Sequence, residues 1–195
     1  MKRLMDIILS AGLLVVLAPL LAVVAVAVKL SSPGPVFFRQ ERIGRFGVPF
    51  NIVKFRTMRT AATGPGITVG GDDRITPVGR FLRAYKLDEL PQLWNILKGE
   101  MSFVGPRPEV PEYVRQFSPE DMLIFKVRPG LTDYASIKYR NEEEVLARQK
   151  DPLAYYRQVI LPDKLRLARQ YVLNRSLKLD VQIMLWTITR ILKYS

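Results

Sequence analysis

The sequence predicts an α+β protein with an N-terminal re-entrant membrane helix, a small β-hairpin and a mainly helical domain with interfacial amphipathic helices. Residues 7–28 form an uncharged apolar run, residues 36–58 hold two strand-like segments around a glycine-containing turn, and the last third repeats apolar residues at helical spacing. The length of 195 residues accommodates one domain plus such an appendage.

The composition restricts the chemistry that is open to the chain. It has 30 Lys and Arg residues against 18 Asp and Glu residues, a formal net charge of +12, which favours a polyanionic partner such as nucleic acid, an anionic membrane or a phosphorylated substrate. Cysteine and histidine are absent, which excludes disulfides, cysteine nucleophiles, Ser-His-Asp triads and histidine-ligated zinc. Catalysis would depend on carboxylates, lysine, tyrosine, hydroxyls or a hard cation such as Mg²⁺.

The apolar run 7–28 is long enough to cross a bilayer core, which needs about 20 residues. Ala25-Val26-Ala27 resembles a signal-peptidase site, but the run exceeds the about 7–15 residues of a signal-peptide core. Positive residues flank both ends: Lys2 and Arg3 before the run, and Lys29, Arg39, Arg42 and Arg45 after it. A helix that enters and leaves on one face satisfies both flanks, and Pro19 can bend it, so we expect a re-entrant hairpin, with a kinked spanning helix as the alternative.

Residues 36–43 and 49–58 predict two strands joined by a turn at 44–47. Strand alternation places Lys54 and Arg56 on one face, where two cations could hold a phosphate or simply face solvent. Residues 60–73 contain four glycines and predict a loop, which lacks the GK[ST] signature of a P-loop.

Residues 77–87 predict a short amphipathic helix with Arg80, Arg83 and Lys86 on its polar side, usually a solvated face. A second helix is predicted from Leu90 to Gly99, with Pro91 in its first turn.

Asp88 and Glu89 immediately precede that second helix. Exposed N–H groups and the helix dipole favour an anion there and would keep Asp88 ionised. Because adjacent helical residues do not face each other, Asp88 and Glu89 are expected to have different roles. The ordinary alternative is an N-cap followed by a first-turn acid.

Two segments place an arginine beside prolines: Gly105–Glu109 around Arg107, and Lys126–Thr132 around Arg128. Arginine binds phosphate oxygens in a bidentate fashion, and neighbouring prolines reduce the entropy lost in positioning it. Each segment could also be a simple loop.

The C-terminal third is helical in pattern, with residues 141–175 interrupted by Pro152 and Pro162. Residues 177–192 carry an apolar stripe, typical of a core-facing helix. The residues Trp186, Arg190, Lys193 and Tyr194 would also suit a helix at a membrane interface.

Five segments together resemble the bacterial sugar transferase family, the monotopic phosphoglycosyl transferases. They are KFRTM (54–58), DRITPVGR (73–80), LDELPQ (87–92), GPRP (105–108) and RPGLT (128–132). The resemblance covers nearly the whole chain and matches the small form that has the catalytic domain only. It implies a re-entrant helix over residues 1–30 and a catalytic domain over 31–195 on the cytoplasmic face of the bacterial inner membrane.

The resemblance also implies a reaction. A UDP-sugar donates its sugar-1-phosphate to a polyprenyl (undecaprenyl) phosphate and UMP is released, the first membrane step of glycoconjugate assembly. Asp88 would attack the β-phosphate and form a covalent phosphosugar intermediate, and Glu89 would complete the catalytic pair. Mg²⁺ would offset the diphosphate charge, with Asp88 as its protein contact.

Substrate binding is expected from residues that neutralise or contact the phosphates: Lys54, Arg56, Arg74, Arg80, Gln92, Arg107 and Arg128. Candidates for lining the sugar or uridine pocket are Tyr134, Ser136, Lys138, Tyr139 and Arg140.

The chain departs from the family pattern in two places. Asp73 stands where many relatives have proline, and residues 131–136 differ from the common Thr-Gly-Leu pattern, which leaves the transferred sugar open. Relatives of this size often handle N-acetylated amino sugars.

Two other functions stay open at this point. The first is a non-catalytic membrane-anchored basic module that binds anionic lipid or nucleic acid. The acid pair and the arginine–proline segments argue against it, and we expect no nucleic acid partner. The second is a nucleotide-sugar hydrolase, which would release free sugar-1-phosphate without a lipid acceptor.

Overall fold

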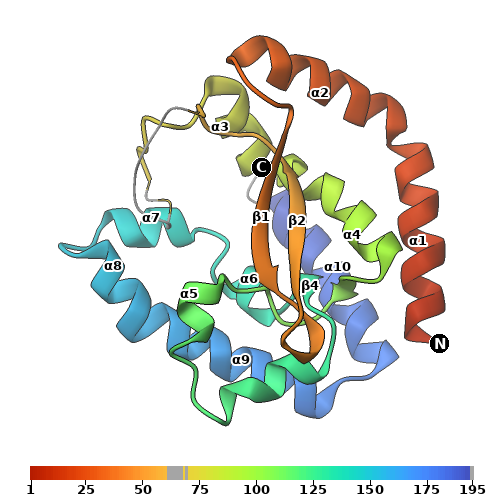
Figure 1. Cartoon of the computed structure of the whole chain (residues 1–195), viewed down its shortest axis with the longest axis vertical. Helices are drawn as coiled ribbons and strands as arrows, with labels where there is room; N and C mark the ends of the chain where they lie inside the picture. Colours follow the sequence, from red (N-terminus) through yellow and green to blue (C-terminus); the bar gives the residue numbers. More distant parts are fainter. Residues whose placement is uncertain (61–67, 69, 194–195) are drawn as a thin grey trace.

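The computed structural model describes residues 1–60, 68 and 70–193 (Figure 1). The elements in chain order are α1 (Lys2–Val16), α2 (Ala18–Ser31), β1 (Phe37–Ile43), η1 (Arg45–Gly47), β2 (Pro49–Phe55), α3 (Pro77–Ala84), η2 (Leu87–Gln92), α4 (Leu93–Lys98), β3 (Ser102–Val104), α5 (Pro111–Val114), η3 (Asp121–Lys126), β4 (Gly130–Thr132), α6 (Tyr134–Lys138), α7 (Glu142–Ala147), α8 (Pro152–Tyr155), η4 (Tyr156–Ile160), α9 (Leu161–Asn174) and α10 (Leu177–Lys193). Most of the predicted glycine-rich loop and Tyr194 lie outside the described residues. The α+β class with a bent apolar helix pair and small sheets is confirmed.

The apolar N-terminal segment forms two helices, α1 and α2, that run along one side of the molecule (Figure 1). Their axes differ by 64°, and Pro19 lies in the first turn of α2, where its missing N–H costs no helical hydrogen bond. The predicted bend near Pro19 is confirmed. Within the described residues no single helix is long and apolar enough to cross a membrane, and α1 and α2 reach that length and composition only as a bent pair.

Lys2 fixes the start of α1 to the body of the protein. Its Nζ donates hydrogen bonds to Asp180 Oδ2 at 2.7 Å, to the Val104 carbonyl at 2.8 Å and to the Tyr171 hydroxyl at 2.9 Å. The Tyr171 hydroxyl in turn donates to the other oxygen of Asp180, which is 2% exposed. This buried network joins α1 to α9, α10 and β3.

Asp6 and Arg3 extend this attachment over the next turns of the helix. The buried Asp6 carboxylate accepts hydrogen bonds from the Ser102 hydroxyl and the Phe103 N–H. Arg3 donates to the carbonyls of Ile96 and Leu97 at the end of α4, where the helix dipole favours a cation. The polar side of α1 is therefore part of the folded domain.

The predicted hairpin is present, with β1 antiparallel to β2 in the register Phe37↔Phe55 to Ile43↔Pro49. The first strand agrees with its predicted range, and the second ends at Phe55, before the predicted end at 58. The buried residues Phe50 and Ile52 lie on the β2 face that also carries Lys54, because side chains alternate along a strand. This alternation directs Lys54 towards η2.

A second sheet, which the sequence analysis did not predict, consists of the parallel pair β3 and β4. Each strand has three residues, with Ser102 opposite Gly130 and Val104 opposite Thr132. A Cβ on Gly130 would lie 2.1 Å from the backbone nitrogen of Gly105, so the chains can approach this closely only without side chains. The pair brings the two arginine–proline segments side by side.

The buried apolar residues form three clusters. One joins β2, α4, β3, α9 and α10, the second lies beneath α5, η3 and the helices α7 to α9, and the third joins α2, β2 and α3. Pro152 opens α8 as expected, whereas Pro162 lies in the first turn of α9 after the π-helical stretch η4.

The last predicted helix, 177–192, corresponds to α10. Its inner face buries Ile183 completely, which agrees with the core interpretation. Its other face exposes Val181, Leu185, Trp186 and Ile188, so an apolar surface also remains on this helix.

Candidate active site

The acid pair lies in the first turn of η2, a 3₁₀ helix that follows Lys86. Lys86 has a left-handed backbone (φ 58°), a sharp reversal that separates α3 from η2. The prediction of one helix from Leu90 is wrong in its first turns, because Pro91 falls inside η2 and the α-helix starts only at Leu93. Its predicted end is confirmed, with Gly99 in a left-handed cap (φ 93°).

Glu89 is held by two cations from different elements. Its Oε1 accepts a hydrogen bond from Lys54 Nζ at 2.8 Å and another from the Arg107 guanidinium at 3.0 Å. Burial alone would raise the pKa of Glu89, but Lys54 and Arg107 hold it well below its usual range. Glu89 is therefore a fixed anion that orients Lys54 and Arg107.

Asp88 has the opposite surroundings. It is 7% exposed, and its Oδ1 has no hydrogen-bond partner among the described residues. Burial, followed by the negative charge of Glu89, raises the pKa of Asp88 to about 6, although nearby cations including Lys54 and Lys86 oppose the rise. At neutral pH this carboxylate is ionised and keeps an oxygen free for a metal ion or an electrophile.

Gln92 lies in the same 3₁₀ segment, four residues after Asp88. It is buried, and its Nε2 donates no hydrogen bond within the described part of the chain. Two buried polar atoms without partners in one short segment indicate that a ligand completes the site.

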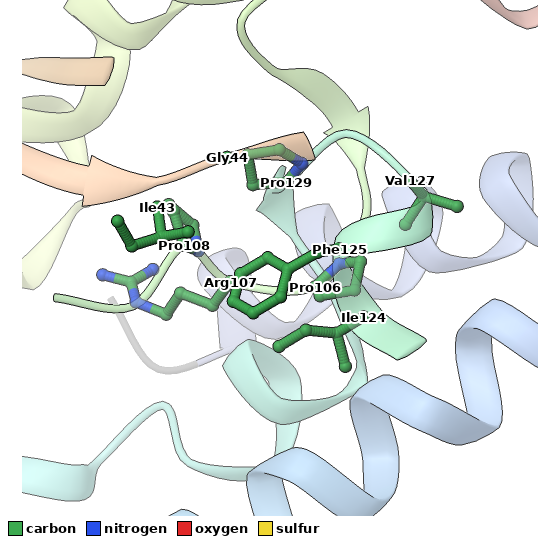
Figure 2. A pocket seen from close by; sticks show the side chains of 9 residues that line it. All are labelled: Ile43, Gly44, Pro106, Arg107, Pro108, Ile124, Phe125, Val127 and Pro129. Atoms are coloured by element: carbon green, nitrogen blue, oxygen red, sulfur yellow. The ribbon is translucent and has the colours of Figure 1, made fainter. Parts of the chain in front are cut away.

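Arg107 is presented by the loop between Pro106 and Pro108. Its backbone N–H donates to Asp133 Oδ2 at 3.3 Å, and the charge of Glu89 raises the pKa of its guanidinium. Arg107 also lines a small cavity, shown in Figure 2, whose other residues are Ile43, Gly44, Pro106, Pro108, Ile124, Phe125, Val127 and Pro129. The guanidinium points away from Ile124 and Val127 (Figure 2).

The other predicted cations have different surroundings. Arg56 is buried and donates to the carbonyls of Val28 and Ser32 at the end of α2. Arg128 donates to the carbonyl of Gly99 at the end of α4. Both therefore cap helix C-termini, a position that favours cations on electrostatic grounds.

Arg74 and Arg80 lie at the start of the α3 region. Arg74 binds both carboxylate oxygens of Asp72, and Arg80 is exposed on α3. Arg83, which was not among the predicted binding residues, contributes a positive charge that opposes the raised pKa of Asp88. Its position five residues before Asp88, on a helix that leads into η2, was the available signal.

The residues proposed to line a sugar or uridine pocket are spread over several environments. Lys138 and Tyr139 bind Asp163, and Arg140 donates to the carbonyl of Ala84. Tyr134 lies beside Trp186, and the buried Ser136 hydroxyl has no partner among the described residues.

The acid pair was tested for its ability to hold Mg²⁺. No group of three or more acidic, histidine or cysteine side chains gathers within the described residues. Glu89 is occupied by cations, so the pair offers Asp88 Oδ1. Mg²⁺ commonly binds one or two carboxylates together with substrate phosphates, and this donor set fits that arrangement.

A free, ionised carboxylate beside buried cations defines a protein that acts on phosphorylated substrates. The model of the family described as bacterial sugar transferase matches residues 1–194. The chain therefore belongs to the bacterial sugar transferase family.

Three curated relatives illustrate the similarity. A UDP-glucose:undecaprenyl-phosphate glucose-1-phosphate transferase of Caulobacter vibrioides is 41% identical over 98% of the chain and 69% of the relative. A protein of the same name from Escherichia coli is 39% identical over 96% of the chain but only 39% of the relative. A UDP-N-acetylgalactosamine-undecaprenyl-phosphate N-acetylgalactosaminephosphotransferase of Aeromonas hydrophila is 38% identical over 98% of the chain and 43% of the relative. The chain thus corresponds to less than half of the last two relatives.

Proposed function

We propose that the chain transfers sugar-1-phosphate from a UDP-sugar to undecaprenyl phosphate and releases UMP, as the first membrane step of glycoconjugate assembly. Family membership and the names of its relatives support this class of reaction. The single observation that carries the mechanism is the contrast within the acid pair: Glu89 is bound by Lys54 and Arg107, while Asp88 Oδ1 is buried without a partner among the described residues.

The first step is a displacement by Asp88. Its Oδ1 bonds to the β-phosphorus of the donor, the bond from that phosphorus to the bridging oxygen breaks, and UMP leaves with the electron pair. Lys54 and Arg107 neutralise charge that builds on the phosphoryl oxygens, an interaction that is strong in a partly dehydrated site. Glu89 positions both cations.

The second step reverses the roles. An oxygen of the lipid phosphate attacks the same phosphorus, the bond from phosphorus to Asp88 breaks, and the free carboxylate is restored. One compact site then serves a water-soluble donor and a lipid acceptor in turn.

Mg²⁺ fits this proposal as a partner of the donor diphosphate. Asp88 would hold it, and the bound ion would supply positive charge to the phosphoryl oxygens. Gln92, buried beside Asp88 in sequence, is suited to donate a hydrogen bond to a phosphate oxygen.

The proposed location is the bacterial inner membrane, with the catalytic residues on the cytoplasmic face. The bent apolar pair α1 and α2 exposes many large apolar side chains, and α10 exposes Trp186 and Ile188. A re-entrant arrangement keeps the flanking cations on one face, and the net charge of +12 attracts anionic lipids.

The proposal is tested by measuring UMP release with a panel of UDP-sugars, undecaprenyl phosphate and Mg²⁺, and by intact-protein mass spectrometry without acceptor. We expect a sugar-phosphate adduct on the wild-type chain and none on Asp88→Asn, whose turnover should fall by about a thousandfold or more. Active protein that never forms the adduct would refute the two-step mechanism. Release of free sugar-1-phosphate without acceptor as the main reaction would instead indicate a hydrolase.

A further inference from the structure

Arg107 separates two cavities of different chemistry. The cavity in Figure 2 is mainly apolar, with Pro106, Pro108 and Phe125 among its lining residues. The second cavity is polar and is lined by Arg107, Glu109, Ile124, Asp133, Ala135, Lys164, Leu165 and Ala168. Since Arg107 also contacts Glu89, the polar cavity adjoins the acid pair through one side chain.

Glu109 is the unusual residue of the polar cavity. It is 7% exposed, and within the described residues its carboxylate takes part in no hydrogen bond or ion pair. Only its backbone carbonyl is used, as an acceptor for the Ile43 N–H. Burying a carboxylate without partners is costly, so such a group calls for a ligand or water that donates to it.

The cations around Glu109 are occupied by other acceptors. Lys164 pairs with Glu142 at 2.5 Å, and Arg42 donates to the Pro108 carbonyl and to Gln40. Their charges, together with Arg107, partly offset the rise that burial causes in the pKa of Glu109. Glu109 therefore lies in a positive field while both carboxylate oxygens remain open as acceptors.

The lining of this cavity selects a class of ligand group. Glu109 and Asp133 would repel a phosphate, and the charged lining disfavours a prenyl chain. Two neighbouring hydroxyl groups can donate to the two oxygens of one carboxylate, and such charge-assisted bonds are stronger than neutral ones. Lys164 and Arg107 can donate to the hydroxyl oxygens in return.

We propose that Glu109, assisted by Lys164, binds a vicinal hydroxyl pair of the nucleotide-sugar donor and thereby contributes to donor specificity. The inference rests on the proposed function, because it assigns the polar cavity beside Arg107 to the same donor. Either the ribose or the transferred sugar supplies such a pair.

The test compares Glu109→Gln with Glu112→Gln, a matched control on an exposed glutamate of the same segment. Glu109→Gln keeps the shape of the side chain but loses the charge, and it should raise the KM for the UDP-sugar by about tenfold or more with a smaller change in kcat. Glu112→Gln should change neither. Glu109→Asp, which keeps the charge on a shorter stem, should give an intermediate KM.

Competition by UMP identifies the hydroxyl pair. If Glu109 binds the ribose, Glu109→Gln weakens UMP inhibition in parallel with the KM. If Glu109 binds the transferred sugar, UMP inhibition is unchanged and the preference among UDP-sugar epimers becomes flatter. A folded Glu109→Gln variant with wild-type KM, UMP inhibition and epimer preference would overturn the proposal.

Calorimetric binding keeps this result separate from the proposed chemistry. UDP-sugar affinity is measured in Asp88→Asn and in Asp88→Asn combined with Glu109→Gln, neither of which depends on turnover. A difference between the two supports the hydroxyl site even if no covalent adduct is found, and equal affinities contradict it even if the adduct forms.

Discussion

Asp88 and Glu89 are neighbours in sequence with opposite electrostatic surroundings. Glu89 is fixed by Lys54 and Arg107, whereas the free oxygen of Asp88 has no described partner and burial raises the pKa of Asp88 to about 6. Environments that push the pKa values of two carboxyls apart indicate two roles for them. Here the split assigns the reacting oxygen to Asp88 and the positioning of cations to Glu89.

The raised pKa of Asp88 predicts a pH dependence of the first half-reaction. Below a pH of about 6 the carboxyl is protonated and a poor nucleophile, so the rate of adduct formation should rise with pH through this range and then level off. Stopped UMP-release measurements without acceptor check this, because the lipid phosphate, which also titrates, is then absent. A flat profile across this range would contradict the role of Asp88.

Glu89→Gln should destabilise the fold as well as reduce turnover. The change leaves Lys54 and Arg107 without their shared anion in a largely buried site, at a cost of about 1–3 kcal/mol. Thermal unfolding measures this. Glu112→Gln, which removes an exposed pair with Arg157, is the control and should stay close to wild type. Equal unfolding temperatures for the two variants would show that Glu89 is not needed to hold the cations.

The sequence could identify the residues around Glu89 but not the roles of all the cations. Lys54 and Arg107 come from separate motifs and meet at one carboxylate. Arg56 and Arg128 look equivalent to them in sequence, yet they donate to carbonyls at the ends of helices. Which acceptor an arginine reaches depends on long-range packing, which local patterns do not contain.

At the scale of elements, local signals predicted well where they were sufficient. The hairpin followed from alternation around a turn, α3 from its amphipathic pattern after Thr76 and Pro77, and the end of α4 from Gly99. The parallel pair β3 and β4 was missed because strands of three residues carry almost no periodic signal and pair across a long sequence separation.

Gly79→Ala tests how tightly α3 packs. A Cβ at Gly79 would lie 2.1 Å from the Thr57 carbonyl oxygen, so the helix would have to move away from the segment that follows β2. We expect a loss of about 1–3 kcal/mol in unfolding free energy.

Gly12→Ala is the matched control for that change. Gly12 is also helical, but an added Cβ meets nothing within 4 Å, so alanine should stabilise α1 by about 0.5–1 kcal/mol. Denaturant unfolding in detergent distinguishes the two variants. A Gly79→Ala variant as stable as Gly12→Ala would contradict the close packing.

At the scale of the whole molecule, an apolar arm and a charged body are joined by a polar seam. The arm is the bent pair α1 and α2, and the seam consists of Lys2, Arg3 and Asp6 with their partners in the body. Composition predicted the arm and its bend. It did not predict the seam, since charged residues next to an apolar run are normally assigned to the membrane surface.

A re-entrant arm predicts a definite labelling pattern. The chain has no cysteine, so Leu4→Cys and Leu30→Cys, both at exposed positions near the two ends of the arm, provide unique sites. In oriented vesicles a membrane-impermeant maleimide should react with both from the cytoplasmic side. Labelling of Leu4→Cys only from the opposite side would establish a spanning helix.

The polar seam also affects any attempt to obtain a water-soluble enzyme. Deleting the first 31 residues would remove the ammonium that pairs with Asp180 and the acceptor of the Ser102 hydroxyl and Phe103 N–H, and it would uncover α4. Truncation would therefore damage the interior of the remaining protein. Replacing the outward-facing leucines and valines of the arm with polar residues is the better route, because it leaves the internal wiring of the molecule intact.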